Sequence, residues 1–196
     1  MKASNVVISF LGPPGCGKGT QSKLLQEKFG FAFFGSGDLL RQRGQVNDFT
    51  GQKIKKIINQ GRLISSLVIA GLWEKEMERV KNLPQFSGLI IDGSPRALSE
   101  AKLIDSGLDW YEWTSKHKVV YLNISYEESE KRLLAKMGRH RKDDTVPALE
   151  ERWNCFRNQT LPVLEYYRQK GALIEIDGNS SVQEVYQSMV RALKLE

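Results

Sequence analysis

The part of the sequence best suited to chemistry is a glycine-rich run at residues 12–20, GPPGCGKGT. A polyphosphate needs many backbone N–H donors pointing inward, and a glycine-rich turn that opens a helix supplies them. Lys18 adds a cation that can reach the outer phosphates, and the Thr20 hydroxyl can lie near a magnesium ion. The run therefore predicts a nucleoside triphosphate site.

A carboxylate follows a second apolar run, GLIIDG at residues 88–93. Asp92 comes directly after the expected strand, so it should lie at the carboxyl edge of a sheet, where ligands of such folds bind. There it can hold water on a magnesium ion. An Asp-Gly pair is also common in turns, so Asp92 supports the site only together with the glycine-rich run.

Short apolar runs alternate with helical patterns along the chain, and these elements must position the polar groups. Residues 6–11 are typical of a buried strand, and residues 20–29 of a helix with one apolar face. Similar apolar runs follow at 89–91, 119–122 and 173–176, each separated by helical stretches long enough for a crossover. This alternation predicts an α/β fold with a parallel sheet and helices on both faces.

Length and composition restrict the class of protein. The 196 residues fit one domain, and 40% hydrophobic with 27% charged residues is typical of a globular chain. The net charge of +6 fits either nucleic acid or a cleft for small polyanions. Because no long run of like charge and no interleaving of basic and aromatic residues occurs, we expect no nucleic-acid partner. No stretch of 18 consecutive apolar residues occurs, so the sequence predicts no membrane-spanning helix.

Two cysteines, Cys16 and Cys155, show no paired spacing. They cannot supply a four-thiolate zinc site, and they favour a reducing, cytoplasmic setting. The two histidines, His117 and His140, have no partner spacing that would make them ligands or a general base, so both are expected at the surface.

Four separated motifs resemble the adenylate kinase family of nucleoside monophosphate kinases. In the first motif Gly19 follows Lys18, where general phosphate loops have Ser or Thr, and this departure is itself a mark of the family. The four motifs are residues 12–20 (GPPGCGKGT), 35–41 (GSGDLLR), 92–96 (DGSPR) and 141–144 (RKDD), with Arg152 behind the last.

The resemblance implies a P-loop NTPase-type three-layer fold, in which helices flank a central parallel sheet. It also implies a helical insert that binds the nucleoside monophosphate and a short lid. The implied core is residues 1–35, 67–136 and 146–196, the insert is about 36–66, and the lid is about 137–145. Because the lid has no room for the cysteine cluster of some relatives, we expect no zinc.

The resemblance implies arginine-rich machinery, as phosphoryl transfer requires. Catalysis of this reaction is mainly positioning and charge neutralisation, and arginine forks grip phosphate oxygens in pairs. The implied catalytic residues are Lys18, Arg96, Arg132, Arg141 and Arg152. Those implied for ATP are Gly15, Cys16, Gly17, Lys18, Gly19, Thr20, Arg132, Arg141 and Asn179. Those implied for AMP are Ser36, Gly37, Arg41, Ile64, Gly93, Arg96, Glu100, Arg141 and Arg152. Magnesium would be held through the nucleotide and water near Thr20 and Asp92.

Several positions depart from the family pattern. Lys136 lies where another arginine is usual, Ser94 replaces a phenylalanine, and residues 61–66 are one residue short. Glu100 stands where relatives carry a glutamine that reads adenine. An ionised carboxylate only accepts hydrogen bonds, which suits the N–H groups of guanine better than adenine. Glu100 could instead face solvent as an acid at the start of a helix.

The leading hypothesis is a monomeric cytoplasmic enzyme that converts ATP and AMP into two ADP with magnesium. It would close its insert and lid over both nucleotides and so exclude water. An alternative of the same fold prefers GMP or another nucleoside monophosphate. An alternative of another class, motivated by the positive charge, is a nucleotide-gated assembly or RNA-associated protein.

Overall fold

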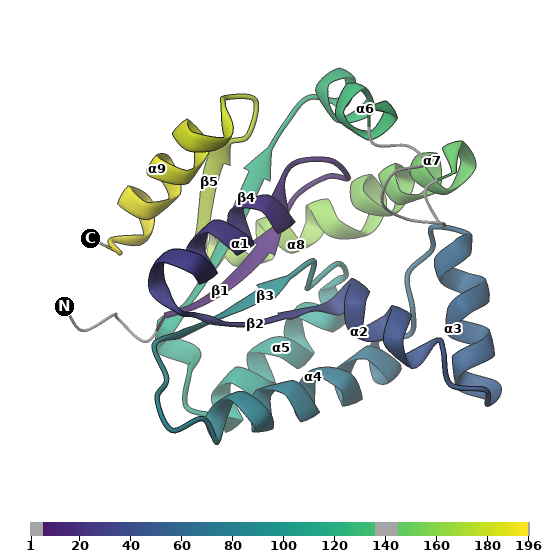
Figure 1. Ribbon diagram of the computed structural model, residues 1–196, viewed down its shortest axis with the longest axis horizontal. Helices are drawn as coiled ribbons and strands as arrows, with labels where there is room; N and C mark the ends of the chain where they lie inside the picture. The colour runs from purple at the N-terminus through teal and green to yellow at the C-terminus, as the bar shows by residue number, and fades with distance from the viewer. Residues whose placement is uncertain (1–5, 136–144, 196) are drawn as a thin grey trace.

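A parallel sheet runs through the centre of the molecule (Figure 1). The computed structural model describes residues 6–135 and 145–195. In these residues the strands are β1 (Val6–Leu11), β2 (Ala32–Gly35), β3 (Gly88–Asp92), β4 (His117–Asn123) and β5 (Leu173–Asp177). They form one sheet in the order β2-β3-β1-β4-β5, and all neighbouring pairs run parallel. The predicted α/β fold with a parallel sheet is confirmed.

The middle strand, β1, is buried on both faces of the sheet. All six of its residues are buried, and it pairs with β3 on one side and β4 on the other. A strand covered by helices on both faces needs apolar side chains on both, so its sequence is a continuous apolar run rather than an alternation. This is why VVISFL identifies a buried strand.

Helices connect successive strands. In the described part of the chain they are α1 (Lys18–Phe29), α2 (Ser36–Arg43), α3 (Phe49–Asn59), α4 (Ser66–Lys81), α5 (Leu98–Trp110), α6 (Tyr126–Leu134), α7 (Val146–Cys155), α8 (Leu161–Gln169) and α9 (Val182–Leu193), with the 3-10 turn η1 (Thr114–Lys116) and the π-helical turn η2 (Phe156–Thr160). No helix in residues 6–135 and 145–195 combines the length and apolar character that a bilayer crossing requires.

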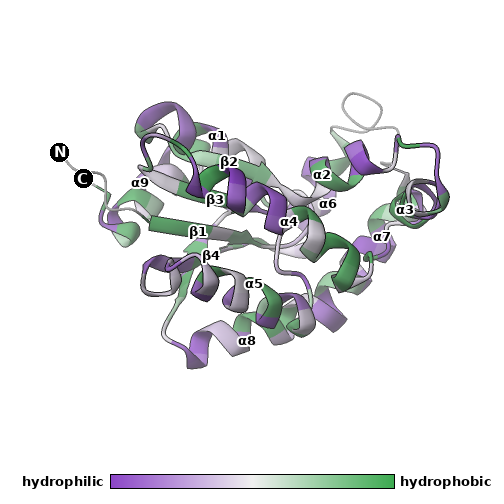
Figure 2. Ribbon diagram, turned by 90° about the horizontal axis from the view of Figure 1, so that it is seen from below, coloured by the Kyte–Doolittle hydropathy of each residue, from purple (hydrophilic) through white to green (hydrophobic). Residues whose placement is uncertain are grey.

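The helices cover both faces of the sheet and complete three layers. On one face, Leu25 of α1 and Met189 of α9 pack with Ile8 of β1. On the other face, α4 and α5 pack over β1 and β3, and α8 packs with α5 over β4. Figure 2 shows α5 and α8 together on one side of the sheet and α1 on the other. The three-layer prediction is confirmed.

The sequence did not predict the edge strand β2. Its four residues, Ala32–Gly35, pair only with β3. A run this short lies within the uncertainty of a periodicity argument, and only its pairing with Leu89–Asp92 makes it a strand. It matters for the site because its last residue, Gly35, leads directly into α2.

Helices α2 and α3 stand between β2 and α4, where the monophosphate-binding insert was predicted. α3 and α7 lie at the same end of the molecule (Figures 1 and 2). After α3, Gly61 has a φ of 73°, and a Cβ there would lie 2.3 Å from the Ala148 carbonyl oxygen. Gly61 therefore allows the insert to touch the start of α7. The predicted insert and core boundaries stay a prediction.

His117 is buried, which corrects the prediction of a surface histidine. Only 7% of it is exposed, its Nε2 lies 2.8 Å from Ser9 Oγ, and its ring meets Tyr167 of α8 edge-on. Burial lowers the pKa of His117 to about 4. It begins β4, and the sequence gives no sign that α8 covers this end of the strand. His140, the other predicted surface histidine, lies outside the described residues.

Candidate active site

The phosphate loop joins β1 to α1 at the carboxyl edge of the sheet. Gly12, Gly15 and Gly17 have φ values of 151°, 79° and 100°, which glycine adopts most readily. A Cβ on Gly12 would also come within 2.6 Å of the Leu122 carbonyl oxygen. Backbone conformation and close packing both require glycine here, so the loop can turn its amides toward a ligand.

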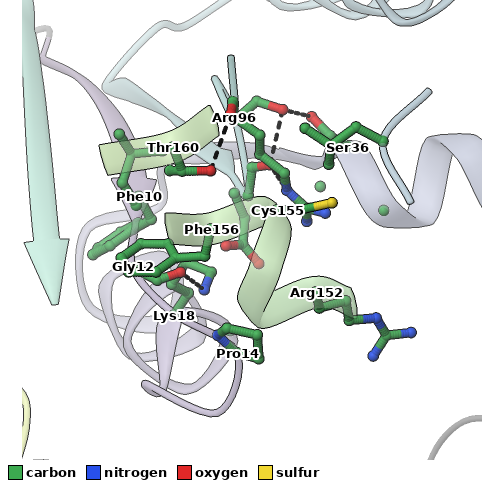
Figure 3. Close-up of a pocket in the computed structure, with 18 of the residues that line it drawn as sticks. Phe10, Gly12, Pro14, Lys18, Ser36, Arg96, Arg152, Cys155, Phe156 and Thr160 are labelled. Atoms are coloured by element: carbon green, nitrogen blue, oxygen red, sulfur yellow. Dashed lines mark hydrogen bonds between the residues drawn. The ribbon is translucent and has the colours of Figure 1, made fainter. Parts of the chain in front are cut away.

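Lys18 folds back onto this loop. Its Nζ donates to the carbonyl oxygens of Gly12 at 2.9 Å and Pro13 at 3.2 Å, and lies 3.3 Å from Cys16 Sγ (Figure 3). These acceptors are neutral. Because hydrogen bonds to charged oxygens are about twice as strong as neutral ones, phosphate oxygens would compete well for the ammonium group.

A buried serine ties the phosphate loop to two later helices. Ser129 of α6 donates to the Pro14 carbonyl oxygen at 2.5 Å and accepts from Trp153 Nε1 of α7 at 3.0 Å. Ser129 has no measurable exposure. The sequence alone indicates neither Ser129 nor Trp153 as part of the site, because a serine on a helix carries no local sign of a distant partner.

The phosphate loop, the start of α2 and the loop after β3 line one cavity of about 480 Å³. This volume lies within the range of small-molecule sites. Every predicted nucleotide-site residue in the described part of the chain lines this cavity, with the exception of Arg132 and Asn179. The structure thus brings together three of the four motifs and Arg152, which are distant in sequence, while the motif at 141–144 lies outside the described residues.

Arg132 and Asn179 meet at the loop between β5 and α9 instead. Arg132 donates to Glu128 Oε1 at 2.7 Å and to the Gly178 carbonyl oxygen at 3.0 Å. Asn179 Oδ1 accepts from the Ser125 amide at 3.4 Å. Arg141 and Lys136 lie outside the described residues, so their predicted positions stay predictions.

Glycines make room for the arginines on the acceptor side of the cavity. Arg41 of α2 pairs with Asp38, and a Cβ on Gly37 would lie 3.2 Å from Arg41 Nη2. Arg96 Nε donates to the Gly93 carbonyl oxygen at 2.6 Å, and a Cβ on Gly93 would lie 2.8 Å from Arg96 Nη2. A side chain at either glycine would displace the guanidinium group beside it.

The main chain of Arg96 is held on both sides. Its amide donates to Glu100 Oε2 at 2.6 Å, and its carbonyl oxygen accepts from Thr160 Oγ1 at 3.0 Å (Figure 3). Thr160 ends the π-helical turn that follows α7, the helix carrying Arg152. The loop after β3 and the turn that follows α7 are therefore joined by a direct hydrogen bond, which the sequence does not predict.

Two serine hydroxyl groups lie side by side in the wall of the cavity. Ser36 Oγ accepts from Trp73 Nε1 at 2.8 Å and from Ser94 Oγ at 2.6 Å. All three side chains are buried. Ser94 therefore gives this wall a small polar side chain that is already hydrogen-bonded within the protein.

Glu100 is buried and does not face solvent, which excludes the solvent-facing alternative. It is 5% exposed, and burial raises its pKa despite the amide and charge of Arg96. It lines the main cavity and also an adjacent cavity of about 320 Å³, whose walls include Ser65, Ser66 and Ser99. Glu100 is thus a common wall of the two cavities.

Oxygen ligands near the phosphate loop would suit magnesium. Thr20 and Asp92 both line the main cavity, and Asp92 Oδ2 lies 3.9 Å from where a Cβ on Gly19 would be. Hard oxygen donors of this kind match the preference of Mg²⁺. In residues 6–135 and 145–195 no group of three or more His, Cys, Asp or Glu side chains could hold a metal ion directly.

This fold and cavity define a P-loop nucleotide-binding protein, because a glycine-rich loop between a central strand and a helix opens into a site lined by arginines. The chain belongs to the adenylate kinase family, whose model matches residues 10–172. Membership makes it a phosphotransferase, specifically a nucleoside monophosphate kinase.

Curated relatives of this family cover nearly the whole chain. It is 37% identical over 188 residues to an adenylate kinase of Azobacteroides pseudotrichonymphae, covering 95% of this chain and 96% of that one. It is 34% identical over 186 residues to an adenylate kinase of Prochlorococcus marinus, covering 95% and 97%. It is also 32% identical over 183 residues to UMP-CMP kinase 1 of Oryza sativa subsp. japonica, covering 93% of this chain and 72% of the relative.

Proposed function

We propose that this enzyme catalyses the reversible transfer ATP + AMP = 2 ADP with magnesium. The observation that carries the proposal is one cavity lined by a phosphate loop on one side and by Arg41 and Arg96 on the other. Two phosphate-bearing ligands held there would meet near Lys18 and Arg152. Most of the curated relatives named above are adenylate kinases.

Each cation has a separate task in this proposal. Lys18 exchanges the carbonyl oxygens of Gly12 and Pro13 for outer phosphate oxygens of ATP. Arg41 and Arg96 hold the phosphate of AMP, and Arg152 neutralises the group in transfer. Fixed cations of this kind cost no reorganisation during the reaction, so they lower its barrier by electrostatic stabilisation.

The remaining ATP contacts would come from the phosphate-loop amides and from the β5–α9 loop. The amides of Gly15, Gly17 and Gly19 would donate to the phosphates, as the glycine pattern predicts. Arg132 and Asn179 already hold the β5–α9 loop through Gly178 and Ser125. In the proposal this loop borders the adenine of ATP, and Arg141 completes the charge around the transferred group.

Thr20 and Asp92 would hold magnesium through water and the nucleotide. The ion would supply charge neutralisation between the outer phosphates. Zinc has no part in the proposal. We further propose a cytoplasmic monomer without nucleic-acid or membrane partners; the two free thiols fit a reducing compartment.

The acceptor is tested by measuring ADP formation from ATP with AMP, GMP, CMP and UMP in turn. We expect the highest kcat/KM with AMP. GMP is the second candidate because an ionised Glu100 would favour it, and a thousandfold preference for GMP would overturn the choice of AMP. Salt-sensitive RNA binding without phosphotransfer to any of the four would favour the RNA-associated alternative.

A further inference from the structure

A chain of two hydrogen bonds runs from α7 through α6 to the phosphate loop. Trp153 Nε1 lies 3.0 Å from Ser129 Oγ, which in turn lies 2.5 Å from the Pro14 carbonyl oxygen. An indole N–H only donates and a carbonyl oxygen only accepts, so the Ser129 hydroxyl group accepts from Trp153 and donates to Pro14. The direction of both hydrogen bonds is therefore fixed.

The phosphate loop also packs directly on α6 at this point. Gly15 has a φ of 79°, and a Cβ there would lie 3.1 Å from both the Ser129 carbonyl oxygen and Leu133 Cγ. Ser129 has no measurable exposure, and Trp153 is 8% exposed. Since the hydroxyl group is shielded from water, loss of either hydrogen bond would leave a buried polar group unsatisfied.

Two aromatic rings pack on the Trp153 indole. Its ring centroid lies 5.0 Å from that of Tyr126 on α6 and 5.6 Å from that of Phe156, which meets it edge-on. Contacts between rings tolerate small changes in offset and angle, whereas the hydrogen bond from Nε1 requires one direction of the indole. The hydrogen bond therefore defines the orientation of Trp153 more narrowly than its packing does.

Arg152 comes directly before Trp153 on α7 and lines the main cavity (Figure 3). Consecutive residues of an α-helix point about 100° apart, so fixing Trp153 in the core also fixes the direction of Arg152. A rotation of α7 by about 10° would move a side chain at the helix surface by about 1 Å. A misplacement of about 1 Å can slow a reaction by about 100-fold.

We propose that Ser129 and Trp153 are positioning residues that set the direction of Arg152 relative to the phosphate loop. Neither of them lines the main cavity, so both act through Arg152. The loop supplies the fixed point, because Pro14 accepts the last hydrogen bond of the chain. The inference rests on the proposed function, in which Arg152 neutralises the group in transfer.

The test measures the rate of phosphoryl transfer in a single turnover at saturating ATP and AMP, so that product release does not set the rate. Trp153→Phe keeps an aromatic ring but removes the N–H donor. The transfer rate should fall by about 10- to 100-fold because Arg152 is misplaced. KM for ATP should change little, since Ser129 still holds Pro14. The matched control is Trp110→Phe, at a tryptophan that is 81% exposed, which should keep the wild-type rate.

Further variants show whether Trp153 acts through Arg152. Arg152→Ala has no guanidinium group left to position, so adding Trp153→Phe to it should lower the transfer rate by less than about twofold. Ser129→Ala removes both hydrogen bonds. It should slow transfer at least as much as Trp153→Phe and also raise KM for ATP, because the phosphate loop loses its hydrogen bond to α6. Melting temperatures check that each variant folds.

Each outcome decides the inference. A Trp153→Phe rate equal to that of wild type refutes it. An equal fall with and without Arg152 also refutes it, because a merely structural tryptophan would behave in that way. If Trp153→Phe does not fold, the same comparison is made with Ser129→Ala in the two backgrounds. If Arg152→Ala itself keeps the wild-type rate, or wild type transfers phosphate to no nucleoside monophosphate, the proposed function fails and the inference falls with it.

Discussion

Acid should destabilise this protein through His117. The imidazole is buried and its pKa is lowered from the usual 6.5 to about 4, chiefly by burial, although Asp105 opposes the shift. His117 Nδ1 lies 4.0 Å from Asp105 Oδ1, but burial outweighs this contact and keeps the ring neutral. Lys170 and Lys118 also disfavour the charged ring.

The sign and size of the effect follow from proton binding. Between pH 6.5 and 4 the unfolded chain binds a proton on His117 that the folded chain does not bind. The stabilising contribution is therefore complete above pH 6.5 and is lost as the pH falls toward 4. A pKa lowered from 6.5 to about 4 corresponds to about 3 kcal/mol.

Urea denaturation of wild type and His117→Gln across this pH range measures the effect. Glutamine keeps a hydrogen-bonding group for Ser9 Oγ, now 2.8 Å from the ring nitrogen, but does not titrate. Relative to the variant, wild type should lose about 3 kcal/mol of unfolding free energy between pH 6.5 and 4. Carboxylates that titrate in both proteins cancel when the unfolding free energy of the variant is subtracted from that of wild type.

Parallel stability curves would show that His117 is not a buried neutral base. A wild-type protein that gains stability over the variant on acidification would show that the charged pair with Asp105 prevails over burial. Either result refutes the reasoning. The test is fair because the Asp105 carboxylate, which would stabilise a charged His117, is held in place. Tyr166 and Tyr167 donate to it at 2.6 and 3.0 Å.

Three further predictions concern activity. Lys18→Ala should lower kcat by about 100- to 1000-fold with an unchanged melting temperature, and near-normal turnover would contradict its place at the phosphates. Thr160→Val removes the donor to the Arg96 carbonyl oxygen. The free energy of unfolding measured in urea should fall by about 1–3 kcal/mol, and KM should rise more for AMP than for ATP. Thr160→Ser keeps the hydroxyl group and should restore both quantities. Excess EDTA should abolish ADP formation and added Mg²⁺ should restore it, without a change in melting temperature; a lowered melting temperature would instead indicate a structural metal.

The sequence predicts those strands that are buried on both faces of the sheet, because each of them is a continuous apolar run. β1 and β4 are covered on both faces, so VVISFL and VVYL are continuous apolar runs. β2 is four residues long and borders only β3, so nothing in its composition separates it from a loop. The same limit explains His117, because its burial depends on a helix that comes much later in the chain.

The phosphate loop could be predicted because all its parts are contiguous and each glycine has a local reason. The hydrogen bonds that hold the site are different, since they join residues far apart in sequence. Ser129 and Pro14 are separated by 115 positions, and Thr160 and Arg96 by 64. A hydroxyl that bonds across such distances looks like any surface serine or threonine until the fold is known.

The hydrogen bond between the Arg96 amide and Glu100 restricts which residues can replace Glu100 in evolution. An apolar residue at position 100 would leave the part-buried Arg96 amide without this acceptor, so it would weaken the loop that carries Arg96. Glutamate and glutamine both keep an oxygen for that amide and differ only in what the other atom offers a base. A lineage can thus exchange these two residues with little structural loss, because both keep the hydrogen bond to the Arg96 amide.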